Sequence, residues 1–379
     1  MKIVYCTDTV CYPGGIQMVT MAKANALAKV PGNEVWIVVT DHTKPPLISL
    51  EDVHLVNLNV NYYEDDWKGY WYIIKGNFQK RRLHKQRLQK FLNEIEPDIV
   101  VSTGTSEKYF LPSLKVKSHP SFIRDMHFVK NYRRLSANSI RDKISSGYSE
   151  FYDYCFKIRK YDKIVTLTHE DRERNWQGNN DVVVIPNPVT AQVNVQSKCC
   201  NPKAIAAGRL VRIKNFSSLI RLWKKVVSVH PEWILEIWGK GDQETVLKNL
   251  IESSALDNNV LLKGYTSDIY AKMAEASMFL LTSEHEGFGL VLLEAMSVGL
   301  PVISYACPTG PRDLITDGEN GFLIQPNDED GFAEKVCRLI EDGELRMKMS
   351  ENALRTSENY QVEKIINMWM DLFHSLRDK

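Results

Sequence analysis

Short apolar runs recur along the chain, and each is followed by a polar turn and a longer segment whose apolar residues have helical spacing. Such runs are typical of buried strands in a parallel sheet, and the longer segments are typical of helices that cover it. The predicted strands are 2–5, 35–39, 97–102, 121–127, 163–167 and 182–185 in the first half, then 204–207, 233–238, 260–262, 278–281, 302–305 and 321–324. The alternation occurs twice, which predicts an α/β protein of two doubly wound domains facing each other across a cleft.

The boundary between the two halves is marked by loss of regular structure. Pro186-Asn187-Pro188 interrupts the pattern, and the polar residues 190–201 indicate a linker. The chain of 379 residues is long for one core, so we predict an N-terminal domain over 1–188 and a C-terminal domain over 189–359. A last helical pattern covers 359–377.

A basic segment lies in the first half. Between Trp67 and Asn93 there is no acidic residue, and apolar residues are interleaved with many basic ones. This pattern indicates a helix that contacts an anionic membrane surface, although it also fits a solvated helix over the core; we favour membrane contact. Residues 131–160 are helical in pattern, rich in Arg, Lys and Tyr, and expected to extend that surface. The basic residues of 67–93 are Lys68, Lys75, Lys80, Arg81, Arg82, Lys85, Arg87 and Lys90.

Composition narrows the class of protein. The formal net charge is +1, so no general attraction to nucleic acid follows. The seven cysteines are scattered and form no Cys-x-x-Cys pair, which argues against a disulfide framework or a zinc site. No signal-peptide core and no apolar run of membrane-spanning length is present. We expect a cytoplasmic protein, soluble or peripheral on the inner face of the cell membrane.

The segment 283–296 is the centre of the candidate chemistry. The strand 278–281 precedes a turn containing Gly287 and Gly289, and an apolar helix follows. Such a turn presents free backbone N–H groups and the positive end of the helix dipole, which favours a phosphate. Glu286 and Glu294 are eight residues apart, roughly 12 Å if helical. This separation suits a nucleotide sugar, whereas a solvated Glu286 and a Glu294 paired with Lys or Arg would be the structural alternative.

A pair of cations follows the first strand of the second half. Arg209 lies at the strand end and Lys214 near the start of the helix from Phe216, where both can neutralise a diphosphate. Two solvated loop cations are the alternative. Cys307 to Asp313 forms a turn before another helix start, a second source of phosphate-facing N–H groups or an ordinary tight turn.

The first half offers fewer candidates. Gly14-Gly15 lies at the end of the first strand, where open parallel sheets bind ligands, or forms an ordinary tight turn. It lacks the Gly-x-Gly-x-x-Gly fingerprint of dinucleotide-binding proteins. His127 lies where the strand 121–127 would end, and a lone histidine is more often structural than catalytic.

Together, the Gly-Arg-Leu-x-x-x-Lys-Asn segment, the Glu-x7-Glu motif and the Gly14-Gly15 turn resemble the retaining glycosyltransferases of family 4, which have the GT-B fold. The resemblance covers nearly the whole chain. It implies two Rossmann-like domains, an N-terminal one for the acceptor and a C-terminal one for the nucleotide sugar. It also implies that residues 360–379 cross back to the N-terminal domain. No metal and no cofactor are expected for a member of this family.

The resemblance also implies roles for individual residues. Arg209 and Lys214 would neutralise the leaving diphosphate, Glu286 would contact the donor sugar and Glu294 the ribose. His127 would lie near the reacting centre, although Phe128 replaces the usual small or acidic follower. The remaining expected donor contacts are Gly14 and Gly15 over the diphosphate, Tyr265 near the base, and Gly287, Phe288, Gly289 and Leu290 near the sugar and phosphate.

The expected activity is transfer of a hexose or N-acetylhexosamine from a nucleotide sugar to a glycan or lipid-linked saccharide, in surface polysaccharide or glycan biosynthesis. The turn 307–313 resembles that of family members using UDP-sugars, so UDP is favoured over GDP. A sugar-nucleotide epimerase or hydrolase of the same fold and a non-catalytic sugar-nucleotide-binding protein are the alternatives. The missing fingerprint disfavours a dehydrogenase.

Overall fold

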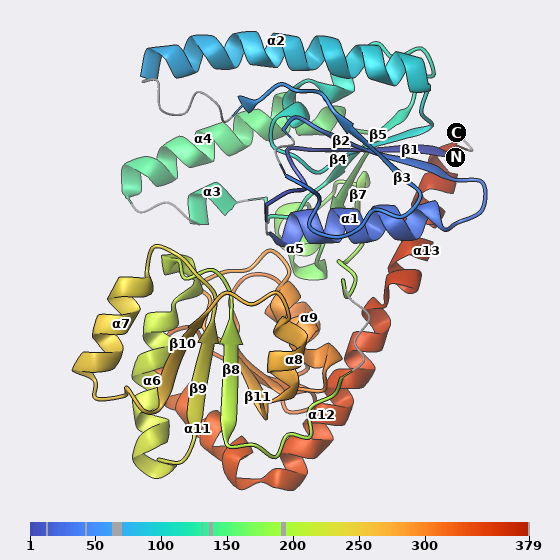
Figure 1. Cartoon of the computed structure of the whole chain (residues 1–379). Helices are drawn as coiled ribbons and strands as arrows, with labels where there is room; N and C mark the ends of the chain where they lie inside the picture. Colours follow the sequence, from blue (N-terminus) through green and yellow to red (C-terminus); the bar gives the residue numbers. More distant parts are fainter. Residues whose placement is uncertain are drawn as a thin grey trace. The chain divides into compact units, whose positions relative to one another are not determined.

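The computed structural model describes residues 1–12, 14–41, 44–62, 70–130, 132–135, 139–190 and 195–377, and for 70–77 the backbone alone. The chain divides into two compact units (Figure 1). The first comprises residues 1–167, 171–190 and 362–379, and the second comprises 168–170 and 191–361. Each unit contains one parallel sheet with helices on both faces, which is the doubly wound architecture expected from the sequence.

The first unit has a seven-stranded parallel sheet in the order β3-β2-β1-β4-β5-β6-β7. The order reverses between β1 and β4, so crossover helices cover both faces. Its strands are β1 (Lys2–Thr7), β2 (Glu34–Val39), β3 (Val53–Asn57), β4 (Ile99–Ser102), β5 (Ser121–Asp125), β6 (Lys163–Thr166) and β7 (Val182–Val184). Its helices are α1 (Gly15–Ala28), α2 (Tyr70–Ile95), α3 (Tyr132–Leu135), α4 (Ile140–Phe156), most of α5 (His169–Asn175) and α13 (Val362–Arg377).

Strand β1 shows how the two faces of this sheet are filled. Its side chains alternate between the faces, as the pleat of a strand requires. Ile3 and Tyr5 belong to the core beneath α1 and α13, and Val4 and Cys6 belong to the core beneath α2. Both faces are apolar, which explains why the sequence reads as a continuous apolar run at this strand.

The second unit has a six-stranded parallel sheet in the order β10-β9-β8-β11-β12-β13. Strands β8 and β11 are neighbours at the point where the strand order reverses. Its strands are β8 (Lys203–Ala207), β9 (Ile234–Trp238), β10 (Val260–Gly264), β11 (Met278–Leu281), β12 (Val302–Tyr305) and β13 (Gly321–Ile324). Its helices are α6 (Phe216–Val229), α7 (Glu244–Ser253), α8 (Ile269–Ala274), α9 (Leu290–Ser297), α10 (Pro311–Leu314), α11 (Glu329–Glu341) and α12 (Gly343–Ser357).

The last helix, α13, belongs to the first unit although it follows the second in sequence. Ile365, Ile366, Trp369 and Phe373 are buried in the core of the first unit. The expected return of the chain is therefore present and begins at Val362. In the second unit, α9 packs against β11 and β12, which buries most of its apolar residues.

Two features differ from expectation. Strand β3 was not predicted, because His54 and the half-buried residues around it lack the long apolar run of the other strands, and β3 has a neighbour on one side only. The single helix expected over 131–160 is instead α3 and α4. The Ser139 hydroxyl accepts a hydrogen bond from the Asp142 amide at 3.1 Å, so Ser139 caps α4 and starts a new helix.

Candidate active site

Two loops of the second unit, one after β8 and one after β11, are held together by hydrogen bonds. The Thr282 hydroxyl donates to the carbonyl oxygens of Lys214 and Asn215, at 3.3 and 3.0 Å. The Glu284 amide donates to the carbonyl oxygen of Ile213 at 2.9 Å. Because β8 and β11 are neighbouring parallel strands, their carboxyl ends meet at the same edge of the sheet. Segments about 70 residues apart thus share one site.

Lys214 and Glu286 form an ion pair at this edge. The Lys214 ammonium Nζ lies 2.6 Å from Glu286 Oε1, and the Ser283 hydroxyl donates to the same oxygen at 2.6 Å. The two charged side chains are 18% and 11% exposed. Glu286 is therefore a partnered acid rather than a solvated loop acid. The predicted meeting of a cation from one loop and an acid from the other is present for this pair.

Arg209 and Tyr265 lie at strand ends of the same sheet but are exposed. Arg209 follows β8, and its side chain makes no hydrogen bond or ion pair with the described residues. Tyr265 follows β10 and is 61% exposed. The Gly239 amide donates to the Gly264 carbonyl at 2.7 Å, which joins the ends of β9 and β10. No contact joins Arg209 to Glu286, so their expected convergence on one ligand stays a prediction.

Glu294 lies on α9 with buried apolar residues on both sides of it in the sequence. Burial raises the pKa of its carboxyl to about 7, and the nearby Lys214 charge lowers it only in part. Its carboxyl has no hydrogen-bond or ion-pair partner among the described residues. The alternative interpretation, in which Glu294 pairs with a Lys or Arg, is therefore wrong for the described residues. The half-buried Glu294 carboxyl is therefore free to accept hydrogen bonds from ligand hydroxyl groups.

The start of α9 adds backbone donors. Gly289 caps the helix with a positive φ of 84°, a conformation that other residues rarely adopt. The amides of Phe288, Gly289 and Leu290 form no hydrogen bond with another described residue. These N–H groups and the helix dipole favour an anion at this end of α9.

The turn at 307–310 supports the Glu286 loop. The Glu286 amide donates to the Pro308 carbonyl at 2.9 Å, and the Thr309 amide and hydroxyl donate to the Glu286 carbonyl at 3.1 and 3.0 Å. A Cβ on Gly310 would lie 2.2 Å from the Phe288 carbonyl oxygen, so only glycine fits there. Sequence analysis identified this turn but not its role, because these contacts join segments that the sequence separates.

The remaining candidates lie in the first unit. Gly14 is the N-terminal cap of α1 in extended conformation, and Gly15 begins the helix. A Cβ on Gly14 would meet only the end of the flexible Gln17 side chain. His127 follows β5 and is buried. The Gly14 carbonyl accepts a hydrogen bond from the Met18 amide at 3.2 Å, which belongs to the first turn of α1 and does not define a role in ligand binding, so the role of Gly14 and Gly15 stays a prediction.

His127 is part of a buried polar cluster that sequence analysis missed. Its Nε2 lies 3.3 Å from Asp125 Oδ2, and Asp125 forms a buried ion pair with Lys23 of α1. Burial lowers the pKa of His127, while Asp125 opposes this effect. Burial raises the pKa of Asp125, but its contacts with His127 and Lys23 outweigh burial and hold that pKa well below its ordinary value. Lys23 also lies 4.7 Å from the centre of the Trp369 ring.

The second unit resembles a known family in sequence. Residues 196–356 match the family model described as glycosyl transferases group 1. An uncharacterized glycosyltransferase of Haemophilus influenzae is 28% identical over 94% of this chain and 95% of its own length. The poly(glycerol-phosphate) α-glucosyltransferase of Bacillus subtilis is 29% identical over 79% of this chain, but the match spans only 45% of that relative.

Solved structures agree with the fold. TarM of Staphylococcus aureus superposes with a TM-score of 0.78 over 98% of both chains, at 15% identity. The lipopolysaccharide outer core galactosyltransferase WaaB superposes with a TM-score of 0.74 over 99% of both chains, at 22% identity. The chain therefore has the GT-B fold, and residues 196–356 of its second unit are similar to the group 1 glycosyl transferases.

Proposed function

We propose that the protein is a retaining, metal-independent glycosyltransferase of family 4. It transfers a hexose or N-acetylhexosamine from a UDP-sugar to a glycan or lipid-linked saccharide acceptor in the synthesis of surface polysaccharide. The observation that carries the proposal is the Lys214–Glu286 ion pair, together with the Glu294 carboxyl, which has no partner among the described residues, and the open N-terminus of α9. This arrangement combines cationic, acidic and backbone N–H groups, as a sugar diphosphate requires.

The residues of the second unit have different roles in donor binding and in the reaction. Lys214 and Arg209 stabilise the negative charge that grows on the leaving diphosphate, together with the N–H groups at the start of α9. The Glu286 carboxylate binds hydroxyl groups of the sugar, and Glu294 binds those of the ribose. The bond from the anomeric carbon to the diphosphate oxygen breaks, and the acceptor oxygen bonds to the same face of that carbon. The acceptor proton passes to the departing diphosphate, so the reaction needs no separate nucleophile.

Solved relatives support the choice of donor. TarM has been crystallised with UDP and the pneumococcal O-GlcNAc transferase GtfA with UDP and GlcNAc. Two curated relatives are named as α-glycosyltransferases of poly(glycerol phosphate) and poly(ribitol phosphate). The comparisons give no support to the epimerase or hydrolase alternative.

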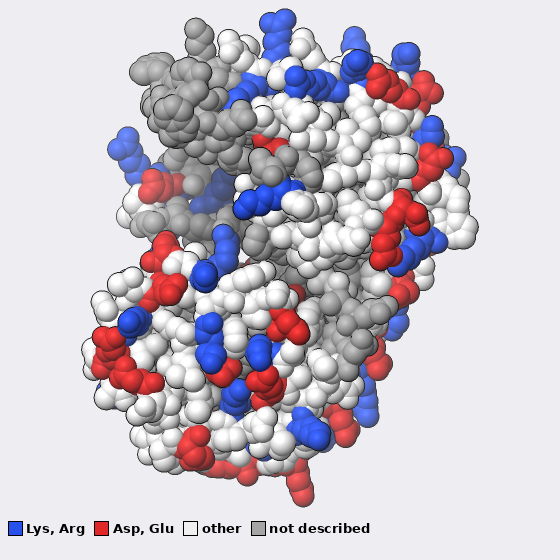
Figure 2. Space-filling model, in the orientation of Figure 1, with Lys and Arg blue, Asp and Glu red and all other residues white. Residues whose placement is uncertain are grey.

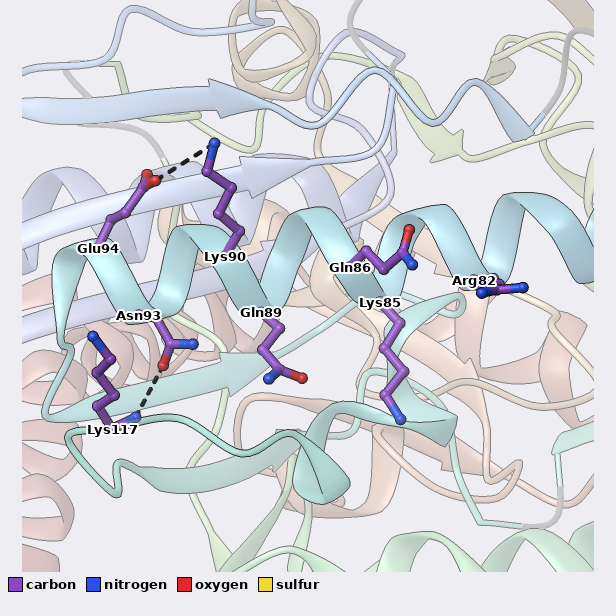
Figure 3. Close-up of a pocket in the computed structure, with 8 residues that line it drawn as sticks. All are labelled: Arg82, Lys85, Gln86, Gln89, Lys90, Asn93, Glu94 and Lys117. Carbon is purple, nitrogen blue, oxygen red and sulfur yellow. Dashed lines mark hydrogen bonds and ion pairs between the residues drawn. The ribbon is translucent and has the colours of Figure 1, made fainter.

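Contact with an anionic membrane is the second part of the proposal. An open groove of about 730 Å³ along α2 is lined by basic and amide side chains and by Glu94, which lies 3.8 Å from the Lys90 ammonium (Figure 3). Lys85 and Lys117 approach the groove from different segments. The space-filling view shows Lys and Arg gathered along the edge where α2 lies (Figure 2). Leu88 and Leu92 of the same helix are fully buried, whereas Phe78 is 74% exposed, so the described part of α2 offers basic side chains together with one large apolar side chain. Lys68, and the side chain of Lys75, lie outside the described residues.

A panel of UDP-, GDP- and ADP-sugars tests the donor assignment. We expect UDP-sugars to raise the melting temperature and to release UDP when an acceptor is present, with the α-anomer retained in the product. Glu294→Ala should weaken UDP binding by about tenfold, because it removes acceptors for ribose hydroxyls. Glu252→Ala, at an exposed position of α7, is the matched control. Interconversion of two UDP-sugars without acceptor would instead favour an epimerase.

A further inference from the structure

Helix α4 presents its polar side chains to its own unit. Asp153 accepts hydrogen bonds from the Tyr109 hydroxyl and from Arg133, both at 3.1 Å, and Lys108 lies 3.9 Å from it. Ser149 accepts a further hydrogen bond from Arg133 at 2.9 Å. Asp153 is the buried residue of this helix. The inward face of α4 is therefore hydrogen-bonded and charged.

Large apolar residues occupy the outward face of the same helix. Ile140, Ile144, Tyr148 and Phe151 are 79%, 70%, 73% and 64% exposed. At about 100° per residue these four positions fall within an arc of about 80°. A helix on a globular protein ordinarily has the opposite arrangement, with its apolar stripe on the core. A contiguous exposed stripe of this kind marks an interaction surface rather than scattered exposed residues.

Basic residues surround this stripe. Arg134, Arg141, Lys143, Arg159 and Lys160 are exposed beside or beyond the helix ends, and Asp142 is the exposed acid on the helix. An apolar stripe with a cationic rim matches the interface of an anionic bilayer, where acyl chains lie beneath negative headgroups. A second copy would instead bring two cationic rims together.

We propose that α4 is the membrane anchor of this protein and inserts Ile144, Tyr148 and Phe151 into an anionic bilayer. This inference deepens the membrane contact of the proposed function. Helix α2 supplies attraction that salt screens, whereas α4 supplies apolar burial that salt does not screen. The two helices are joined through Tyr109, whose ring lies 4.8 Å from the Arg81 guanidinium of α2 and whose hydroxyl bonds Asp153 of α4.

Vesicle flotation of the full chain tests this inference. The wild type should bind phosphatidylglycerol-containing vesicles at about 0.1 M salt and keep part of that binding at about 1 M salt, where charges are screened within about 3 Å. Ile144→Gln with Phe151→Gln should reduce the salt-resistant binding by about tenfold or more, because two buried side chains are lost. Val229→Gln with Val246→Gln, at exposed positions of the second unit, should leave binding unchanged.

Three outcomes would overturn the inference. The wild type would fail to bind vesicles, or the α4 double variant would bind them as well as the wild type does. The third is a wild-type protein that forms a dimer in solution, with the dimer absent in the double variant. Release of UDP in the presence of a water-soluble acceptor separates this test from the proposed function. The α4 double variant should retain that activity. A wild type that binds vesicles but has no transfer activity would contradict the enzyme assignment without contradicting the role of α4 as the membrane anchor.

Discussion

Glu294 keeps a carboxyl group among apolar neighbours, which ties stability to pH. Its pKa is about 7 in the folded protein against an ordinary 4.5, so the folded state holds the proton to higher pH than the unfolded chain. The free energy of unfolding should therefore fall as pH rises between those values, and Glu294→Gln should remove that fall. Between about pH 5 and about pH 8, the free energy of unfolding of the variant should rise by about 1 to 3 kcal/mol relative to that of the wild type, as measured by urea unfolding. Parallel profiles for the two proteins would contradict this pKa.

Lys214 differs from Glu294 because it is already paired. Lys214→Ala removes the cation beside Glu286 and leaves that acid with the Ser283 hydroxyl. We expect kcat to fall by about 100-fold with a smaller change in KM, because the lost charge acts mainly on the leaving diphosphate. Steady-state UDP release measures both constants. Lys225→Ala breaks an exposed ion pair with Asp330 and is the control. Equal loss in the two variants would refute a specific role.

The buried Lys23–Asp125 pair leads to a prediction about stability. Lys23→Met leaves Asp125 buried without its ammonium partner, so the free energy of unfolding should fall by about 3 to 5 kcal/mol. Lys29→Met is the matched control on the same segment, since Lys29 pairs with Glu51 on the surface and both side chains are more than half exposed. Chemical denaturation of the three proteins measures the difference. Similar losses for the two variants would show that the buried pair adds nothing.

Among the elements, α9 depends most on one backbone conformation. Gly289→Ala forces a side chain onto a residue with φ of 84° and places its Cβ 3.2 Å from Leu292. Gly318→Ala has a φ of 79° but open space around the added Cβ, so it isolates the backbone strain. Both should lose about 1 to 2 kcal/mol of stability, and only Gly289→Ala should also weaken UDP binding. Calorimetric titration with UDP separates the two effects, and equal affinities would argue against anion binding at this helix.

Elements with long apolar runs could be predicted from the sequence. Elements whose burial or orientation depends on tertiary contacts could not. Strands β11, β12 and β13 begin and end at the predicted residues because each is a short apolar run with a clear boundary. Polar residues flank β11 and β13, and Pro301 precedes β12. Strand β3 was missed because its residues are mostly half-buried. The outward apolar face of α4 was also missed. Spacing along a helix shows that an apolar stripe exists, but not which way the tertiary contacts turn it.

The candidate site shows the same division between local and distant contacts. Glu286, Glu294 and Lys214 were predicted from local motifs, and the Lys214–Glu286 contact follows once β8 and β11 are adjacent. The Lys23–Asp125 pair joins residues 102 positions apart in sequence. Neither residue belongs to a motif, and no pattern in the sequence specifies which buried cation meets which buried acid.

At the scale of the whole molecule, α13 makes the first unit depend on the end of the chain. Trp369 is fully buried in the first unit and packs against Phe373 with ring centres 5.6 Å apart. Trp369→Ala should therefore lower the free energy of unfolding of that unit by about 3 to 5 kcal/mol and leave the second unit unchanged. Met368→Ala, at a position 40% exposed on the same helix, is the control.

Thermal unfolding with and without UDP can assign the two transitions. UDP should raise only the transition of the second unit, because a ligand stabilises the unit that binds it. In Trp369→Ala the transition that UDP does not shift should move to lower temperature, and the shifted one should stay in place. A single transition that moves as a whole would mean that the units unfold together, in which case the C-terminal helix couples them rather than completing one of them.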